Sequence, residues 1–125
     1  MITGAVNTNR EATVRLLVRG PDRQEETIEA VVDTGFTGYL TLPSSLISFL
    51  GLMWLGRQQG ILGDGSIQQF DVYTATVMWD NRLRTIEIDA AETIPLIGMS
   101  LLYGHELRIQ AVENGQVTIE ALHGF

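Results

Sequence analysis

The chain has 125 residues, of which 45% are apolar and 18% charged, and its 15 acidic against 8 basic side chains give a formal net charge of −7. This composition excludes a disordered chain, and the absence of cysteine excludes disulfides, thiolate metal sites and a cysteine nucleophile. Because an acidic chain repels phosphate backbones, we expect no nucleic acid partner.

Residues 1–125 are expected to form one domain, since a chain of this length buries a single core. The first ten residues lack the basic start and apolar stretch of a secretory signal. The most apolar run, residues 46–55, falls far short of the roughly 20 residues of a membrane span. With only His105 and His123 as imidazole ligands, we expect no metal and no other cofactor. The sequence therefore predicts a cytoplasmic protein with no membrane partner.

The first part of the chain predicts an antiparallel pair of strands. Residues 13–19 and 27–33 are rich in Val, Leu, Ile and Thr, which favour strands. A Gly-Pro turn lies between them, where Pro cannot donate to a ladder and Gly accepts positive φ.

A short strand, a helix and a long hairpin are expected next. Residues 39–42 have the composition of a strand. Residues 43–51 predict a helix, because Pro suits its first turn, its apolar residues cluster on one side and a glycine suits its end. The extended runs 59–62 and 67–79 flank a glycine-rich tip at 63–66, which predicts a hairpin.

The last part of the chain predicts further short elements. They are a strand at 83–88, an apolar run at 94–98 stopped by glycine, one or two helical turns at 99–104, and strands at 106–112 and 116–120 joined by an Asn-Gly turn. The whole pattern predicts an all-β fold with two small helices.

One tripeptide, Asp33-Thr34-Gly35, has the pattern of a catalytic site. Asp33 ends an apolar run, where loss of hydration raises the free energy of its charged form. Thr34 supplies a hydroxyl, and Gly35 lets backbone N–H groups and a reacting molecule come close. Such a carboxylate is suited to activate a water molecule. The alternative is ordinary turn chemistry, because Asp and Gly are common in turns.

The order of these parts resembles that of the retropepsin-like aspartic proteases, in particular the small single-domain bacterial members with Asp-Thr-Gly-Phe-Ser/Thr-Gly. The resemblance rests on residues 30–35, the glycine-tipped hairpin, and Pro95-Leu-Ile-Gly98 followed by a helix, and it extends from about Thr13 to about Ile119. It implies an all-β, closed acid-protease barrel with one or two short helices and one lobe per chain.

In that family two aspartates face each other with the attacking water between them. This chain has one Asp-Thr-Gly, so the resemblance implies a homodimer in which Asp33 of each subunit completes the dyad and a peptide or protein substrate is cleaved. By the same resemblance, Thr34 braces the dyad across the dimer axis, Gly35 keeps the carboxylates accessible, and Gly98 belongs to the loop that crosses beneath them.

The resemblance also assigns a flap to Gly63, Asp64 and Gly65, which would close over an extended peptide. For Asp64 the simpler interpretation is a turn residue, because Asp-Gly is common at hairpin tips. Phe36 departs from the small residue that many members have after the glycine, and we interpret it as core or dimer packing.

Other polar and aromatic residues are given structural interpretations. We interpret Asp71 and Asp89 as solvated residues, His105 as a helix-end residue favoured by the helix dipole, and Trp54 and Trp79 as core or interface residues.

The terminal segments, residues 2–6 and 116–120, are candidates for pairing between subunits. The reason is that a lone edge strand exposes unpaired backbone groups. Two alternative functions stay open: a dimeric interaction module that keeps Asp33 with negligible cleavage, and a self-processing domain cut from a larger precursor.

Overall fold

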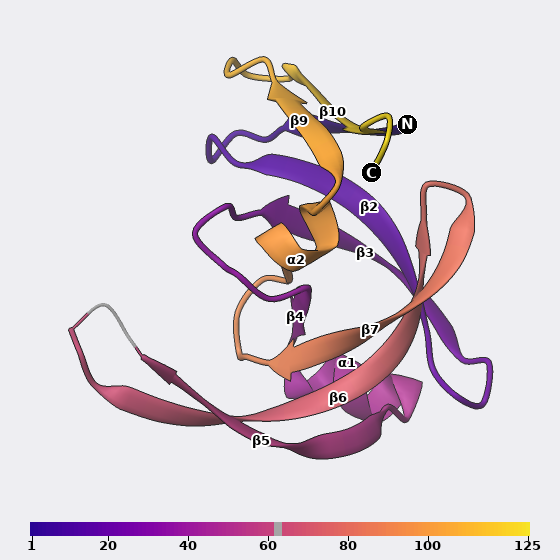
Figure 1. Ribbon diagram of the computed structural model, residues 1–125, viewed down its shortest axis with the longest axis vertical. Helices are drawn as coiled ribbons and strands as arrows, with labels where there is room; N and C mark the ends of the chain where they lie inside the picture. Colours follow the sequence, from indigo (N-terminus) through magenta and orange to yellow (C-terminus); the bar gives the residue numbers. More distant parts are fainter. Residues whose placement is uncertain (62–63) are drawn as a thin grey trace.

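The computed structural model describes residues 1–61 and 64–125. All of its strands belong to one sheet, and two short helices pack against that sheet (Figure 1). The strands are β1 (Ile2–Val6), β2 (Ala12–Arg19), β3 (Glu25–Val32), β4 (Leu40–Leu42), β5 (Met53–Ile61), β6 (Ile67–Trp79), β7 (Arg82–Ala90), β8 (Leu96–Ile97), β9 (His105–Ile109) and β10 (Gln116–Ala121). The helices are α1 (Ser44–Leu50) and α2 (Met99–Leu102). The prediction of an all-β fold with two short helices is confirmed.

The strand pairings run round a ring. The neighbours follow one another in the order β6, β7, β4, β8, β3 and β2, and β2 then pairs with β6 through Val18–Val77 and Arg19–Thr76. Beyond this ring, β1, β10 and β9 extend the sheet next to β2, and β5 extends it next to β6. The β5–β6 hairpin reaches away from the rest of the chain, while both termini lie together at the opposite end (Figure 1).

The core lies inside this ring and follows the two-residue period of the strands. In β2, for example, Val14, Leu16 and Val18 are buried while Arg15 between them is exposed. Residues from distant segments meet these side chains in one continuous cluster. Its fully buried members include Leu40, Leu42, Leu50, Val77, Ile88, Ile97 and Leu101.

The sheet contains two parallel strand pairs, and one of them positions the end of β3. β3 pairs with β8 through Val31–Leu96 and Val32–Ile97, and β4 pairs with β7. The first pair aligns two segments in which apolar residues precede a glycine. As a result, Asp33 and Gly98 lie at neighbouring strand ends.

Helix α1 begins and ends as its sequence predicts. Pro43 occupies the N-cap position, and Gly51 ends the helix with φ of 60°, the left-handed conformation that glycine adopts without strain. The Gly51 N–H donates to the carbonyl oxygens of Ile47 and Ser48. Neither helix in the described part of the chain has the length and apolar character to cross a membrane.

The interpretation of the terminal strands as free edges is wrong. β1 lies between β2 and β10, and β10 lies between β1 and β9, so both strands pair on both sides within the chain. The sheet edges are instead β5 and β9. The hairpin that precedes the C-terminus forms, but β9 ends at Ile109 because the chain bends back through residues 110–115, where the Gly115 N–H donates to the Val112 carbonyl.

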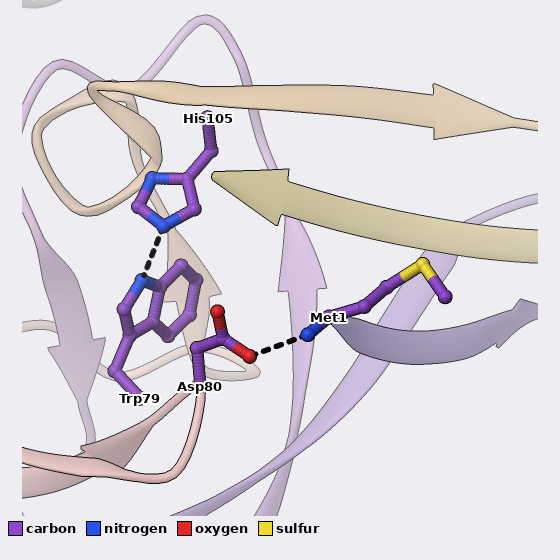
Figure 2. A network of polar contacts seen from close by, with 4 residues as sticks. All are labelled: Met1, Trp79, Asp80 and His105. Carbon is purple, nitrogen blue, oxygen red and sulfur yellow. Dashed lines mark hydrogen bonds and ion pairs between the residues drawn. The ribbon is translucent and has the colours of Figure 1, made fainter. Parts of the chain in front are cut away.

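The helix-end interpretation of His105 is also wrong, since His105 begins β9. The Trp79 indole N–H donates to His105 Nε2 at 3.2 Å (Figure 2). The His105 Nδ1 atom lies 3.1 Å from the Tyr103 carbonyl oxygen. Next to this pair, the Met1 amine donates to Asp80 (Figure 2). These contacts join the β6–β7 turn to β9 and β1.

The two tryptophans have different environments. Trp79 is buried, as expected of a core residue, whereas Trp54 on β5 is 57% exposed. The Trp54 indole donates to Asp71 at 3.2 Å, and Arg57 donates to the same carboxylate oxygen. Asp71 therefore has hydrogen-bond partners on the surface of the β5–β6 hairpin.

Candidate active site

Asp33 follows β3 and is held by its own backbone and that of its neighbours. Its N–H donates to the Ile97 carbonyl at 2.9 Å, which continues the β3–β8 pairing by one residue. Its carboxylate oxygen Oδ1 accepts the Gly35 N–H at 2.9 Å, and its carbonyl accepts the Phe36 N–H at 3.1 Å. The half-buried carboxylate thus has a defined position at the strand end.

Thr34 and Gly35 are exposed in the single chain. The Thr34 hydroxyl has no hydrogen-bond partner among the described residues. At Gly35 an added Cβ would lie 3.3 Å from Asp33 Oδ1, so a side chain here would crowd the carboxylate. The tripeptide that the sequence singled out therefore presents a carboxylate, a hydroxyl and an open backbone at one point of the surface.

The segment that begins at Gly98 packs against this loop. The N–H groups of residues 98–100 donate to loop carbonyls at distances of 2.8 to 3.1 Å, the acceptors being Tyr39, Phe36 and Gly38. A Cβ at Gly98 would lie 2.2 Å from the Gly38 carbonyl oxygen. Only glycine leaves room for this close approach.

Phe36 packs within its own chain. Its ring lies so close to Gly38 and Gly98 that an added Cβ would come within 2.5 Å and 2.6 Å of ring carbons, respectively. The two glycines therefore make room for a bulky side chain. This contact agrees with the interpretation of Phe36 as a packing residue.

The tip of the β5–β6 hairpin carries the residues assigned to a flap. Gly63 lies outside the described residues. Asp64 is exposed, and its Oδ1 accepts the Ser66 hydroxyl at 2.6 Å and the Ser66 N–H at 2.9 Å, which together hold the pKa of this carboxyl below its usual range. Gly65 has φ of 84°. In this conformation, Asp64 and Gly65 act as turn residues.

A cavity of about 750 Å³ separates this hairpin from the loop after Asp33. Its walls include Gly35 and Phe36 of the loop, Gly60 and Phe70 of the hairpin, and Asp89 at the end of β7. A second cavity, of about 940 Å³, borders Asp33 itself and is lined in part by the exposed apolar side chains of Ile109 and Val112. The loop with Asp33-Thr34-Gly35 therefore lies between two hollows.

The sequence interpretation of Asp89 as a solvated residue is wrong. The side chain is half-buried, and burial, followed by the nearby charge of Glu87, raises its pKa to about 6. Its Oδ2 atom would lie 3.0 Å from a Cβ on Gly38, which places the carboxylate against the loop that follows Asp33. The alternation of residues 86–90 could have shown that positions 87 and 89 share a face, but not that this face lines a cavity.

Replacing Asp89 with Asn should stabilise the protein at neutral pH. The folded-state pKa of about 6 lies above the ordinary aspartate pKa of 3.8, so the folded chain binds more protons between these two values and its stability falls as the pH rises through this window. Since solvent screens a half-exposed group, we expect a gain of about 1 kcal/mol, or roughly 3 °C in Tm, at pH 7.5. Thermal unfolding at pH 7.5 and pH 4 checks this, because an equal gain at both values would contradict the electrostatic cause.

The part of the chain that the structure describes contains no group of three or more His, Asp and Glu side chains able to hold a metal ion.

Comparisons with known proteins identify the fold. No protein-family model matches the chain, and no curated protein matches it by sequence. Among solved structures, the chain is similar to a retropepsin-like aspartic protease from Rickettsia conorii, with a TM-score of 0.61 and 19% identity over 97% of this chain and 90% of that one. It is also similar to the protease of EIAV in complex with the inhibitor HBY-793, with a TM-score of 0.55 and 19% identity over 77% of this chain and 88% of that one. The chain therefore has the fold of the retropepsin-like aspartic proteases.

Proposed function

We propose that the chain is a retropepsin-like aspartic endopeptidase that works as a homodimer, with Asp33 of each subunit forming one catalytic dyad. The observation that carries this proposal is Asp33-Thr34-Gly35 at the end of β3, in a fold shared with aspartic proteases. Because fold alone does not determine activity, the proposed activity depends on these three residues rather than on the sheet topology.

The exposure of the site supports a second subunit. One chain supplies one such aspartate, and the Thr34 hydroxyl beside it has no partner among the described residues. Ile109 and Val112, which line the cavity at Asp33, are 41% and 65% exposed. A second copy packed against this side would cover apolar surface and bring the two carboxylates together.

Two adjacent carboxyl groups that share one proton would supply both the general base and the general acid that peptide hydrolysis needs. Like charges a few ångströms apart do not both ionise cheaply, so one carboxyl keeps its proton. The ionised Asp33 takes a proton from water, whose oxygen attacks the peptide carbonyl carbon, while the protonated Asp33 donates to the carbonyl oxygen. The tetrahedral diol then collapses: the C–N bond breaks, the leaving nitrogen takes a proton, and a carboxyl and an amine are released.

The β5–β6 hairpin would act as a flap in this reaction. It forms one wall of the cavity beside the catalytic loop, with Gly60 and Phe70 facing the space. An extended peptide could lie between the hairpin and the loop and pair with main-chain groups. Closure of the hairpin would then exclude water from the reacting bond.

The test is to incubate a diverse mixture of denatured peptides with the wild-type protein and with Asp33→Asn, from acidic to neutral pH, and to identify the products by mass spectrometry. We expect cuts that appear with the wild type and are absent with the variant. Cuts that persist in Asp33→Asn would overturn the assignment. Wild-type protein that cleaves nothing at any pH but binds a partner equally well in both forms would identify an interaction module.

The dimer has a separate prediction. Sedimentation equilibrium over a wide concentration range should show a monomer–dimer equilibrium for both the wild type and Asp33→Asn, because Asn has nearly the same shape as Asp. Cleavage activity per chain should rise with concentration in step with the dimer fraction. Activity that stays constant per chain in samples containing only monomer would exclude the dyad.

A further inference from the structure

The cavity between the β5–β6 hairpin and the catalytic loop has a size suited to a ligand side chain. Its volume of about 750 Å³ lies within the usual range for ligand pockets, roughly 300–1,000 Å³. Phe36 and Phe70 supply apolar wall, and Gly35 connects the cavity with the proposed catalytic aspartate. A peptide held at Asp33 could therefore place one of its side chains in this space.

Asp89 is the charged group best placed inside this cavity. It lies at the end of β7, where Thr41 of β4 and Val72 of β6 are its neighbours in the sheet. Its half-buried carboxylate faces the loop at Gly38, and neither a hydrogen bond nor an ion pair to it occurs within residues 1–61 and 64–125. A carboxylate that has lost part of its hydration gains most from a charged donor.

The other charged residues among the described lining have the same sign of charge as Asp89. Glu87 and Glu92 also line the cavity, and none of the described residues around it is Lys, Arg or His. Both glutamates are exposed, and Glu92 accepts the Ser44 N–H at 2.8 Å, so Asp89 is the least hydrated of the three. The cavity thus offers a cation an apolar wall and a carboxylate without a partner.

We propose that this cavity binds a Lys or Arg side chain of an extended peptide substrate, and that Asp89 is the residue that selects it. The aliphatic stem would pack along Phe36 and Phe70 while the charged end reaches the carboxylate. This inference rests on the proposed peptidase function and adds a substrate class to it.

The selection should depend on pH. Burial and Glu87 raise the pKa of Asp89 to about 6, and Glu92 and Tyr39 are the other ionisable side chains among the described residues that line the space. Above this pKa the carboxylate is charged and attracts a cation. Below it the carboxyl is neutral, so the preference for a basic side chain should weaken as the pH falls from 7.5 to 5.

The experiment compares cut sites in a peptide library prepared with a glutamate-specific protease, which leaves Lys and Arg inside the peptides. We expect the wild type to enrich Lys or Arg about tenfold at one position near the cut, Asp89→Asn to lose this enrichment, and Glu29→Gln to retain it. Glu29 is an exposed carboxylate on β3 that does not line the cavity, so its replacement controls for net charge. Cuts that depend on Asp33 but show no basic enrichment, or an enrichment unchanged in Asp89→Asn, would overturn the proposal and leave the peptidase function standing.

A binding measurement tests the cavity independently of turnover. Labelled decapeptides of alternating Val and Ser, differing only in a central Lys, norleucine or Glu, are titrated into Asp33→Asn and into Asp33→Asn/Asp89→Asn at pH 7.5 and pH 5. We expect the Lys peptide to bind about tenfold more tightly than the norleucine peptide at pH 7.5, only when Asp89 is present. Equal affinities in all cases would overturn the assignment of Asp89 even if no peptide is ever cleaved.

Discussion

When wild-type and Asp33→Asn subunits are mixed in equal amounts, peptide hydrolysis should fall to about a quarter of that of the same total amount of wild type, because random pairing leaves that fraction of dimers with two intact subunits. A mixed dimer has one carboxyl and one amide, so no pair of carboxyls shares the proton that the mechanism requires. The measurement is the initial rate of hydrolysis after the two proteins have been mixed and allowed to exchange subunits. A rate of about half that of the same total amount of wild type would show that each chain acts alone.

The Asp33→Asn variant on its own shows how strongly peptide hydrolysis depends on this carboxylate. Loss of the general base should lower kcat by about 10³-fold. The fold should survive, because the Asn side-chain oxygen can accept the Gly35 N–H as Asp33 Oδ1 does at 2.9 Å. Unchanged thermal unfolding together with the lost activity would separate catalysis from stability, whereas a collapse of the fold would require Asp33→Glu as the second variant.

Local sequence patterns predicted the elements that depend on neighbouring residues. The Val, Leu, Ile and Thr content of residues 13–19 and 27–33, together with the Gly-Pro turn between them, predicts the hairpin seen as β2 and β3. Pro43 and Gly51 mark the ends of α1 by their own backbone preferences. The Asp-Thr-Gly motif was found in the same way, since the combination of an apolar strand and an acidic end is visible in a few consecutive residues.

The features that the sequence did not predict depend on contacts between segments that lie far apart in the chain. The pairing of β1 with β2 and β10 brings together segments from both ends of the chain, and no property of residues 2–6 distinguishes a central strand from an edge. Asp89 shows the same limit, because its solvation depends on β4, β6 and the loop at Gly38. Charged residues on alternating strands are usually solvated, so burial of this one required the tertiary structure.

Gly98 and the two residues after it support the loop that follows Asp33. Replacing Gly98 with Ala should destabilise the protein by about 3 kcal/mol, or roughly 10 °C in Tm, and abolish peptide hydrolysis. The new Cβ would lie 2.2 Å from the Gly38 carbonyl oxygen and 2.8 Å from that of Phe36, and both atoms belong to backbone that cannot rotate away. Relief of the clash must therefore separate the 98–100 segment from the loop and break the hydrogen bonds that fix the loop behind Asp33.

Gly60 provides the matched control for this prediction. An added Cβ there would meet only the edge of the Phe70 ring, at 3.2 Å, and this side chain can rotate aside. Gly60→Ala should therefore change Tm by only a few degrees in thermal unfolding followed by circular dichroism. If Gly98→Ala unfolded within about 2 °C of the wild type, the close packing of Gly98 against the loop would not be what holds Asp33 in place. A large drop in Tm for Gly98→Ala but not for Gly60→Ala would instead show that the loop after Asp33 depends on its contact with the end of β8.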